Sequence, residues 1–364
     1  MAEMWIHMGP QHPMTHGLWN LRIKVDGETI TDAVPELGYL HRSVEKIGER
    51  RKYFMNTTLT DRLCYASAMT WTHCYCLTVE ELMGVETPQR AKYIRTIVLE
   101  LQRIASHLMW LGAYLPDLGL ITGFLYGMRD REMFLNLLEI PSGGRLLYNY
   151  VKIGGVKRDL PPGFAAKAER VMQTLEKRLK EYEDLYDNSK IFRMRTDDVG
   201  CYSASDAINW GITGPNLRSA GVAFDLRQAD SYDAYPELDF TPVTTSASDG
   251  ISDCFSRYRQ RIDEMYQSMD LIRQALAKMP EGEVMADSVP VRASGEAFRR
   301  TEDSRGEALM YLVGDGTDRP YRWKIRSPMF TTVSASPHFL KGYKVADVPA
   351  IMGSIDMCIG ETDK

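Results

Sequence analysis

The sequence predicts an α+β fold, with a mainly helical core and a small β-unit toward each end of the chain. Three observations lead to this prediction. Long segments in the middle of the chain place apolar residues at helical spacing. A hairpin pattern with an Asp-Gly turn lies near the beginning, and two strand-like segments around Gly314-Asp315-Gly316 lie near the end.

The first unit, residues 1–58, is expected to hold a loop and a β-hairpin. Apolar residues alternate with Arg22 and Lys24, Asp26-Gly27 interrupts the alternation, and a second strand-like segment follows. Such alternation is typical of a half-buried strand, and Asp-Gly favours the tight turn between two antiparallel strands. A short charged helix is predicted at 44–51.

The second unit, residues 59–280, is the predicted helical core. Thr87-Pro88 is a typical helix start, because proline fits the first turn, where its missing N–H needs no partner. Apolar residues recur every three or four positions in several segments, which predicts helices at 60–83, from 87–88 onward, at 162–185 and at 254–279.

One apolar segment, 104–128, is long enough to cross a membrane and has Asp117 as its only formal charge. Glycines interrupt this segment, and Pro116-Asp117 lies near its middle. Proline removes a helical hydrogen bond, and a carboxylate in the middle of a bilayer is costly. We therefore expect a helix, a turn and a second element that lie in the protein core.

The third unit, residues 281–364, is predicted to complete the core. It begins with a connector, at 281–291, that is rich in Pro, Gly and acidic residues. Strands are predicted at 308–313 and 321–325, and a short apolar helix at 345–355.

The composition limits the possible functions. The chain of 364 residues has 49 acidic and 44 basic residues, and this mild negative charge argues against nucleic-acid binding driven by bulk charge. Its six cysteines are too sparse for a disulfide scaffold and form no C-x-x-C pair, so a reducing compartment is expected. Residues 1–7 lack the pattern of a secretory signal, and no glycine-rich loop for NAD or ATP is present.

The loop at 9–17 contains two histidines that are candidates for chemistry. His12 and His16 have the spacing of a metal-binding pair on a helix, but Pro13 disfavours a helix there. Two interpretations remain. Either nearby backbone groups satisfy both histidines, or a rigid loop presents one imidazole to a ligand, to which it can pass a proton near neutral pH.

Asp117 and Tyr65 are the other candidates, and each has a structural alternative. Asp117 either caps an element that starts at Leu118 or pairs with a histidine, which it would orient and charge. Tyr65, expected on the helix at 60–83, is by itself most simply a core tyrosine whose hydroxyl has a partner.

Several segments, taken together, resemble the 49-kDa subunit of respiratory complex I. Their order along the chain is that of the family, and the resemblance extends from Gly9 to Lys364. The matching segments are Gly9-Pro10-Gln11-His12-Pro13-Met14-Thr15-His16-Gly17, Gly38-Tyr39-Leu40-His41-Arg42, Asp61-Arg62-Leu63-Cys64-Tyr65, Arg103-Ile104-Ala105-Ser106-His107-Leu108, Gly214-Pro215-Asn216-Leu217-Arg218 and Ser304-Arg305-Gly306-Glu307.

This family is related to the large subunit of nickel–iron hydrogenases, whose metal site uses two C-x-x-C pairs. The fold that the resemblance implies is therefore a hydrogenase large-subunit-like helical core. Here only Cys64 and Cys358 remain, and Ser67 and Glu361 occupy the second position of each pair. A nickel–iron centre needs soft sulfur ligands that bridge two metals, so we predict that this chain binds no metal.

The resemblance implies a site for the headgroup of a quinone or quinone-like acceptor. Carried over residue by residue, His16 and Tyr65 would bind the headgroup, and Asp117 would be the carboxylate paired with that histidine. His41 and Arg42 would face the terminal iron–sulfur cluster of a small partner subunit. The chain would bind no cofactor alone, since the cluster belongs to the partner and the quinone is the substrate.

The activity implied is that of the acceptor-reducing subunit of a complex I-like, proton-pumping dehydrogenase. Its partners would be the small iron–sulfur subunit, other peripheral-arm subunits, integral membrane subunits and a lipid-soluble acceptor, without nucleic acid. It would lie peripherally on the cytoplasmic, or equivalent matrix or stromal, face of a membrane.

The sequence leaves the electron donor open among NADH, a reduced deazaflavin coenzyme and ferredoxin. Other interpretations are a deazaflavin-dependent dehydrogenase that reduces a phenazine-type acceptor, a membrane-bound hydrogenase-type large subunit, and a non-catalytic scaffold between iron–sulfur subunits. The missing thiolates argue against the hydrogenase interpretation.

Overall fold

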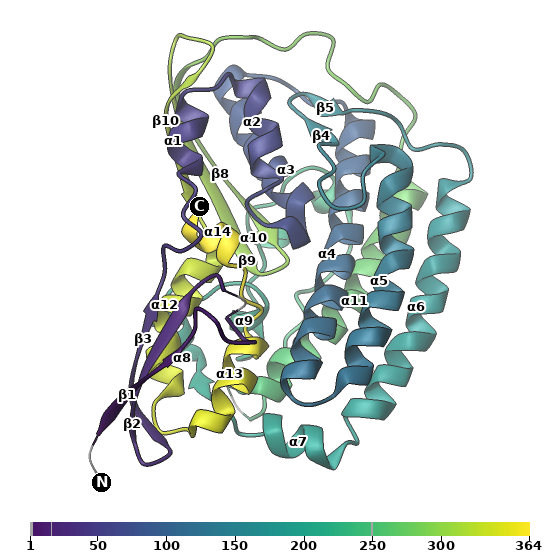
Figure 1. Cartoon of the computed structure of the whole chain (residues 1–364). Helices are drawn as coiled ribbons and strands as arrows, with labels where there is room; N and C mark the ends of the chain where they lie inside the picture. Colours follow the sequence, from purple (N-terminus) through teal and green to yellow (C-terminus); the bar gives the residue numbers. More distant parts are fainter. Residues whose placement is uncertain (1–2, 16, 249) are drawn as a thin grey trace.

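The computed structural model describes residues 3–15, 17–248 and 250–364, and it confirms the predicted α+β class. Four long helices run side by side in one half of the molecule, and two three-stranded antiparallel sheets lie in the other half (Figure 1). The long helices are α4 (Gln89–Asp117), α5 (Ile121–Ser142), α6 (Phe164–Tyr186) and α11 (Cys254–Lys278).

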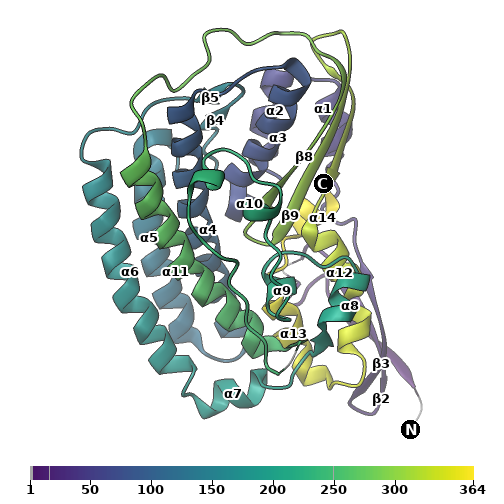
Figure 2. The same ribbon diagram turned by 180° about the vertical axis from the view of Figure 1, so that it is seen from behind.

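Helix α4 is buried over most of its length and packs against both α5 and α11, the latter seen best from behind (Figure 2). As predicted, the apolar segment forms a helix ending at Asp117, a turn and a second helix. A Cβ atom at Gly127 would lie 2.9 Å from the carbonyl oxygen of Leu108, and one at Gly123 would overlap Leu115. The interrupting glycines therefore let α5 lie directly against α4. No helix within the described ranges is long and apolar enough to cross a membrane.

The single helix predicted at 60–83 is wrong in its first part, because the chain bends there. The buried Asp61 carboxylate accepts hydrogen bonds from the Thr72 hydroxyl and from the backbone N–H of Asn149. A buried carboxylate must find such partners, and these bonds to Thr72 and Asn149 hold the chain in the bend before the apolar periodicity resumes. The structure instead has α2 (Tyr53–Thr60), the short 3-10 helix η1 (Tyr65–Ser67) and α3 (Ala68–Met83).

The N-terminal sheet confirms the predicted hairpin and adds one strand. Gly27 in the hairpin turn has a φ of 63°, which glycine adopts without strain. The added strand is too short to show a period in the sequence. The sheet has the order β1-β2-β3 and consists of β1 (Met4–Met8), β2 (Asn20–Asp26) and β3 (Thr29–Glu36).

The second sheet confirms both predicted C-terminal strands and adds β8, whose first residues are mainly exposed and polar and so show no apolar alternation. It has the order β10-β9-β8 and consists of β8 (Ser294–Asp303), β9 (Gly306–Asp315) and β10 (Pro320–Arg326). Two small two-stranded sheets pair β4 (Val151–Lys152) with β5 (Gly155–Val156) and β6 (Tyr202–Ser203) with β7 (Ile251–Ser252).

The shorter helices lie in the connections. Helix α1 confirms the predicted helix at 44–51, and η3 and α13 confirm the predicted helix at 345–355. Helix α12 was not predicted, because Pro337 lies inside it. These elements are α1 (Val44–Glu49), α7 (Lys190–Thr196), α8 (Ala204–Asn209), α9 (Pro215–Arg218), α10 (Leu226–Ala229), η2 (Tyr235–Glu237), α12 (Pro328–Leu340), η3 (Val345–Asp347), α13 (Val348–Ser354) and α14 (Ile359–Asp363).

The buried apolar side chains form two clusters. The larger lies among the long helices, α3 and the C-terminal sheet, and the smaller joins the N-terminal sheet to α12 and α13. The two ends of the chain therefore share a core.

The division into units 1–58, 59–280 and 281–364 stays a prediction.

The core also buries titratable groups, from which we predict a loss of stability in acid. Burial lowers the pKa of His107 to about 4, although its hydrogen bond to Glu264 opposes this. Burial alone would raise the pKa of Glu100, but Arg227 and Arg103 bring it to about 2.

Both pKa values lie below those of the unfolded chain, which therefore binds more protons than the folded chain in acid. Because of His107, we expect the free energy of unfolding to fall as the pH drops from about 6.5 toward 4. Because of Glu100, we expect a further fall as the pH drops from about 4.5 toward 2, where the unfolded chain binds the Glu100 proton more readily than the folded chain does. Urea unfolding of the purified chain at several pH values measures this. His107→Gln should flatten the upper part of the curve, and an unchanged slope would contradict the assignment to His107.

Candidate functional site

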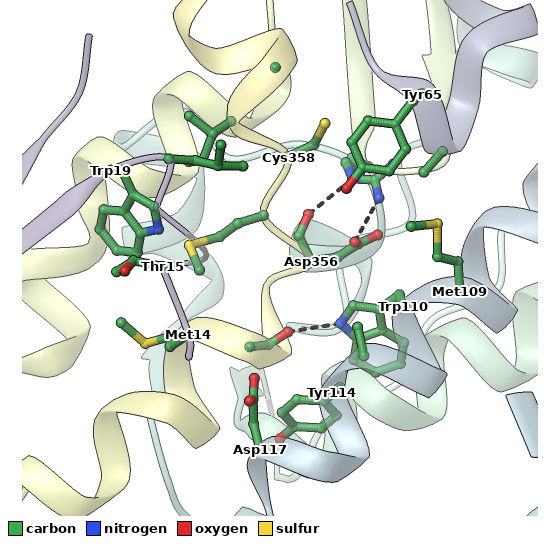
Figure 3. A pocket seen from close by; sticks show the side chains of 18 residues that line it. Met14, Thr15, Trp19, Tyr65, Met109, Trp110, Tyr114, Asp117, Asp356 and Cys358 are labelled. Atoms are coloured by element: carbon green, nitrogen blue, oxygen red, sulfur yellow. Dashed lines mark hydrogen bonds and ion pairs between the residues drawn. The ribbon is translucent and has the colours of Figure 1, made fainter. Parts of the chain in front are cut away.

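A cavity opens where the N-terminal loop, the C-terminal part of α4 and the C-terminal segment of the chain meet (Figure 3). Its volume is about 110 Å³. Its lining includes Met14, Thr15, Leu18, Trp19, Tyr65, Ala66, Met109, Trp110, Tyr114, Asp117, Arg305, Gly353, Asp356, Met357, Cys358 and Gly360.

Tyr65 and Asp117, both predicted site residues, line this same cavity. In Figure 3 they lie at opposite ends of it, with Trp19 on one side and Trp110 on the other. His16 lies outside the described residues, but Met14 and Thr15 beside it line the cavity. The structure therefore brings two of the three predicted catalytic residues to one site.

Tyr65 is not the core tyrosine on a long helix that its position in the sequence suggests. It begins η1, directly after the bend at 61–64, and its side chain is 45% exposed. Burial of the rest of the ring, and then the thiols of Cys358 and Cys64, raise the pKa of Tyr65 above its ordinary value. The phenol therefore keeps its proton at neutral pH and can donate a hydrogen bond into the cavity.

Asp117 is the last residue of α4 and does not cap the next helix, whose N-cap is Leu120. The interpretation as a cap is thus wrong, because the turn continues for three residues beyond Asp117. Asp117 lies beside Gly353, where a Cβ atom would sit 2.8 Å from the Tyr114 ring and 3.6 Å from an Asp117 carboxylate oxygen. The missing side chain at Gly353 makes room for both groups.

His41 and Arg42 lie outside the cavity, next to the C-terminal helix α14. The His41 ring nitrogen Nδ1 bonds the backbone oxygen of Asp363 at 2.6 Å. Arg42 Nη2 donates to the carbonyl oxygens of Arg62, at 2.8 Å, and Gly360, at 3.1 Å. Arg42 therefore connects the two segments that carry Tyr65 and Cys358 to the cavity wall.

Arg305 and Asp356 form a buried ion pair in the wall, which sequence reasoning missed as part of a site. Arg305 Nη2 donates to Asp356 Oδ1 at 2.8 Å, and Nε donates to the Asp356 backbone oxygen at 3.0 Å. Burial raises the pKa of Asp356, although Arg305 and Arg261 lower it. The only sequence signal was the Arg305-Gly306-Glu307 segment, which by itself indicates no more than a salt bridge.

Cys358, which lines the cavity, comes together with Cys64 and Glu361 behind the wall. The two sulfur atoms and a Glu361 carboxylate oxygen lie within 4.8 Å of one another, and all three residues are buried. The Ser67 hydroxyl bonds Asp303 instead of joining this group, and Arg305 Nη1 lies 3.3 Å from Cys64 Sγ. With two thiols, one carboxyl and an adjacent cation, this residue set does not fit a nickel–iron centre.

Known relatives match almost the whole chain, and a family model matches the part that begins at residue 117. A family model described as the 49 Kd subunit of respiratory-chain NADH dehydrogenase matches residues 117–294 and 288–364. The chain is 42% identical over 370 residues to a subunit of the F(420)H(2) dehydrogenase of Methanosarcina mazei, an alignment that covers 100% of this chain and 98% of that relative. It is 45% identical over 366 residues to a subunit of the NADH-quinone oxidoreductase of Geobacillus kaustophilus. It is also 45% identical over 362 residues to a subunit of the NADH-quinone oxidoreductase of Dehalococcoides mccartyi. Each alignment covers 99% of this chain and 98% of the relative.

Proposed function

Since the chain belongs to the family of the 49-kDa subunit of respiratory-chain NADH dehydrogenase, we propose that it forms the site where a complex I-like, proton-pumping dehydrogenase reduces a quinone-type acceptor. The chain is a subunit of a multi-subunit oxidoreductase. The observation that carries the finer proposal is the single cavity lined by Tyr65 and Asp117.

The lining of the cavity suits a flat ring with polar atoms at its edge. Trp19, Trp110 and Met109 offer apolar faces, and Tyr65 offers a protonated hydroxyl. Reduction of a quinone adds two electrons and two protons, so each carbonyl oxygen needs a hydrogen-bond donor. Tyr65 would serve one oxygen and His16 the other, with Asp117 stabilising the charged form of the imidazole.

The electrons would come from the terminal iron–sulfur cluster of a small partner subunit, at the face that holds His41 and Arg42. Further partners would be the peripheral-arm and integral membrane subunits, which would hold this chain on the cytoplasmic, or equivalent, face of a membrane. The chain itself would bind no metal and no nucleic acid.

The names of relatives favour two of the three proposed electron donors. Relatives named after NADH and after F420H2 cover the chain almost fully, at 45% and 42% identity. The second candidate function is therefore that of a deazaflavin-linked dehydrogenase, whose acceptor would be of the phenazine type. Assay of the purified complex with NADH, reduced deazaflavin coenzyme and reduced ferredoxin identifies the donor.

Asp117→Asn tests the site directly. The substitution keeps the size of the side chain and removes its charge, so we expect a fully assembled complex whose acceptor reduction is roughly 10- to 100-fold slower. The rate per assembled complex and the proton pumping of membrane vesicles are the measurements. Asp184→Asn, on the exposed face of α6, is the matched control. Unchanged turnover and pumping in Asp117→Asn would refute the proposed role.

A further inference from the structure

Two cysteines from opposite ends of the chain meet beside the cavity. Cys64 is completely buried, whereas Cys358 is 6% exposed and contributes to the cavity lining. Their sulfur atoms lie within 4.8 Å of each other, and both thiols are free. A disulfide bond needs a separation of about 2.05 Å, so the sulfur atoms would have to approach by at most roughly 2.8 Å.

The backbone around the two cysteines favours such an approach. Each cysteine is an extended residue just before a short helix, with φ and ψ of −127° and 106° at Cys64 and −122° and 103° at Cys358. Neither residue is fixed within a long helix, so a small rotation can move its sulfur atom.

The two segments are also held close together. A Cβ atom at Gly360 would lie 2.6 Å from the carbonyl oxygen of Leu63, so glycine is needed for this contact. Arg42 bonds carbonyl oxygens of both segments, one at Arg62 and one at Gly360. The fold therefore keeps the two thiols side by side.

The surroundings of the pair assign different roles to the two thiols. Cys358 faces the cavity and meets a small molecule that enters it. Cys64 lies behind, with Arg305 Nη1 3.3 Å from its sulfur. Burial raises the pKa of the Cys64 thiol well above its ordinary value, and the Arg305 guanidinium opposes this effect because it stabilises the negative charge that develops on sulfur when the thiol attacks.

We propose that Cys64 and Cys358 are a redox-active dithiol that forms a reversible disulfide when a peroxide enters the cavity. The peroxide oxidises the Cys358 thiol to a sulfenic acid and is itself reduced to water. Cys64 then attacks the Cys358 sulfur and displaces its hydroxyl group, which leaves as a second water with the Cys64 proton. The two thiols lose two electrons in total, and a dithiol reductant returns them.

The disulfide is expected to stop the reduction of the acceptor in the cavity. Cys358 lines the cavity and Tyr65 follows Cys64 directly, so a bond between the two sulfur atoms alters the wall beside the phenol and fixes the segment that carries it. This consequence rests on the proposed function, whereas the formation of the disulfide does not.

The test uses membranes that contain the assembled complex. They are treated with hydrogen peroxide, free thiols are blocked with N-ethylmaleimide, and the chain is digested without reductant for mass spectrometry. We expect a linked peptide that contains Cys64 and Cys358, disappears with dithiothreitol, and accompanies a reversible loss of acceptor reduction. C64S and C358S should each lack the linked peptide. Peroxide should also remove a smaller fraction of acceptor reduction in each of these variants than in the unaltered complex. C201S, at a half-buried cysteine elsewhere, should respond as the unaltered chain does.

Other outcomes overturn the proposal. If both thiols are recovered separately blocked or overoxidised, the pair is not a redox dithiol. If the isolated complex holds stoichiometric zinc or nickel that either serine variant releases, the thiols are metal ligands instead. A disulfide that forms without loss of acceptor reduction overturns the switch alone, and Asp117→Asn still tests the proposed function separately.

Discussion

Replacement of Tyr65 with phenylalanine is expected to slow acceptor reduction about 100-fold while the subunit still folds and assembles. The hydroxyl lies at the edge of the cavity on a side chain that is 45% exposed, so its removal leaves no buried polar group unpaired and changes little in the packing. The raised pKa of Tyr65 keeps its proton in place for transfer. The loss should therefore appear in the chemical step rather than in stability.

The measurement is the rate of reduction of a water-soluble quinone analogue by the purified complex, per assembled complex, across a range of pH. Tyr321→Phe provides the matched control, because Tyr321 is also exposed but lies on β10, away from the cavity. If Tyr65→Phe keeps full turnover in an assembled complex, the chain is better described as a scaffold between iron–sulfur subunits.

The sequence predicted the long helices and both hairpin strands because their apolar periods extend over many residues. It failed where short polar contacts decide the path, as at Asp61, whose buried carboxylate bends the predicted helix at 60–83. It also missed β8 and α12, since polar exposed residues and an internal Pro337 hide the period.

Only part of the candidate site could be predicted from the sequence. Tyr65 and Asp117 were predicted through resemblance to a family, and their shared cavity agrees with that prediction. The pairing of Arg305 with Asp356, and of Cys64 with Cys358, joins residues far apart in the chain. No local period or spacing encodes such contacts, because they depend on how segments that are distant in the chain pack together.

A separate buried network, centred on Arg218, is expected to make a large contribution to stability. Its guanidinium is completely buried, and it contacts carboxylates from three different segments. These contacts are Glu264 at 2.9 Å, Glu302 at 2.7 Å and Asp225 at 3.5 Å. Arg218, and then the neighbouring His107, hold the pKa of Glu264 well below its ordinary value against the opposing effect of burial.

Replacement of Arg218 with methionine preserves most of the side-chain volume and leaves these carboxylates without their common cation. Removal of one partner of a buried ion pair costs about 3–5 kcal/mol, which is a large part of the roughly 5–15 kcal/mol that stabilises a typical domain. We therefore expect a large decrease in the urea concentration at the midpoint of unfolding, or failure of the chain to accumulate.

A second substitution keeps this prediction testable even if the first variant does not fold. Glu302 has lost its nearest cation in Arg218→Met, so Glu302→Gln in that background should restore about 1–2 kcal/mol, or visible accumulation of the chain. Arg178→Met is the control, because its ion pair with Glu181 is partly exposed to solvent and such pairs contribute at most about 1 kcal/mol. If Arg218→Met unfolds at the same urea concentration as Arg178→Met, the buried carboxylates find other partners, and the network does not stabilise the fold as proposed.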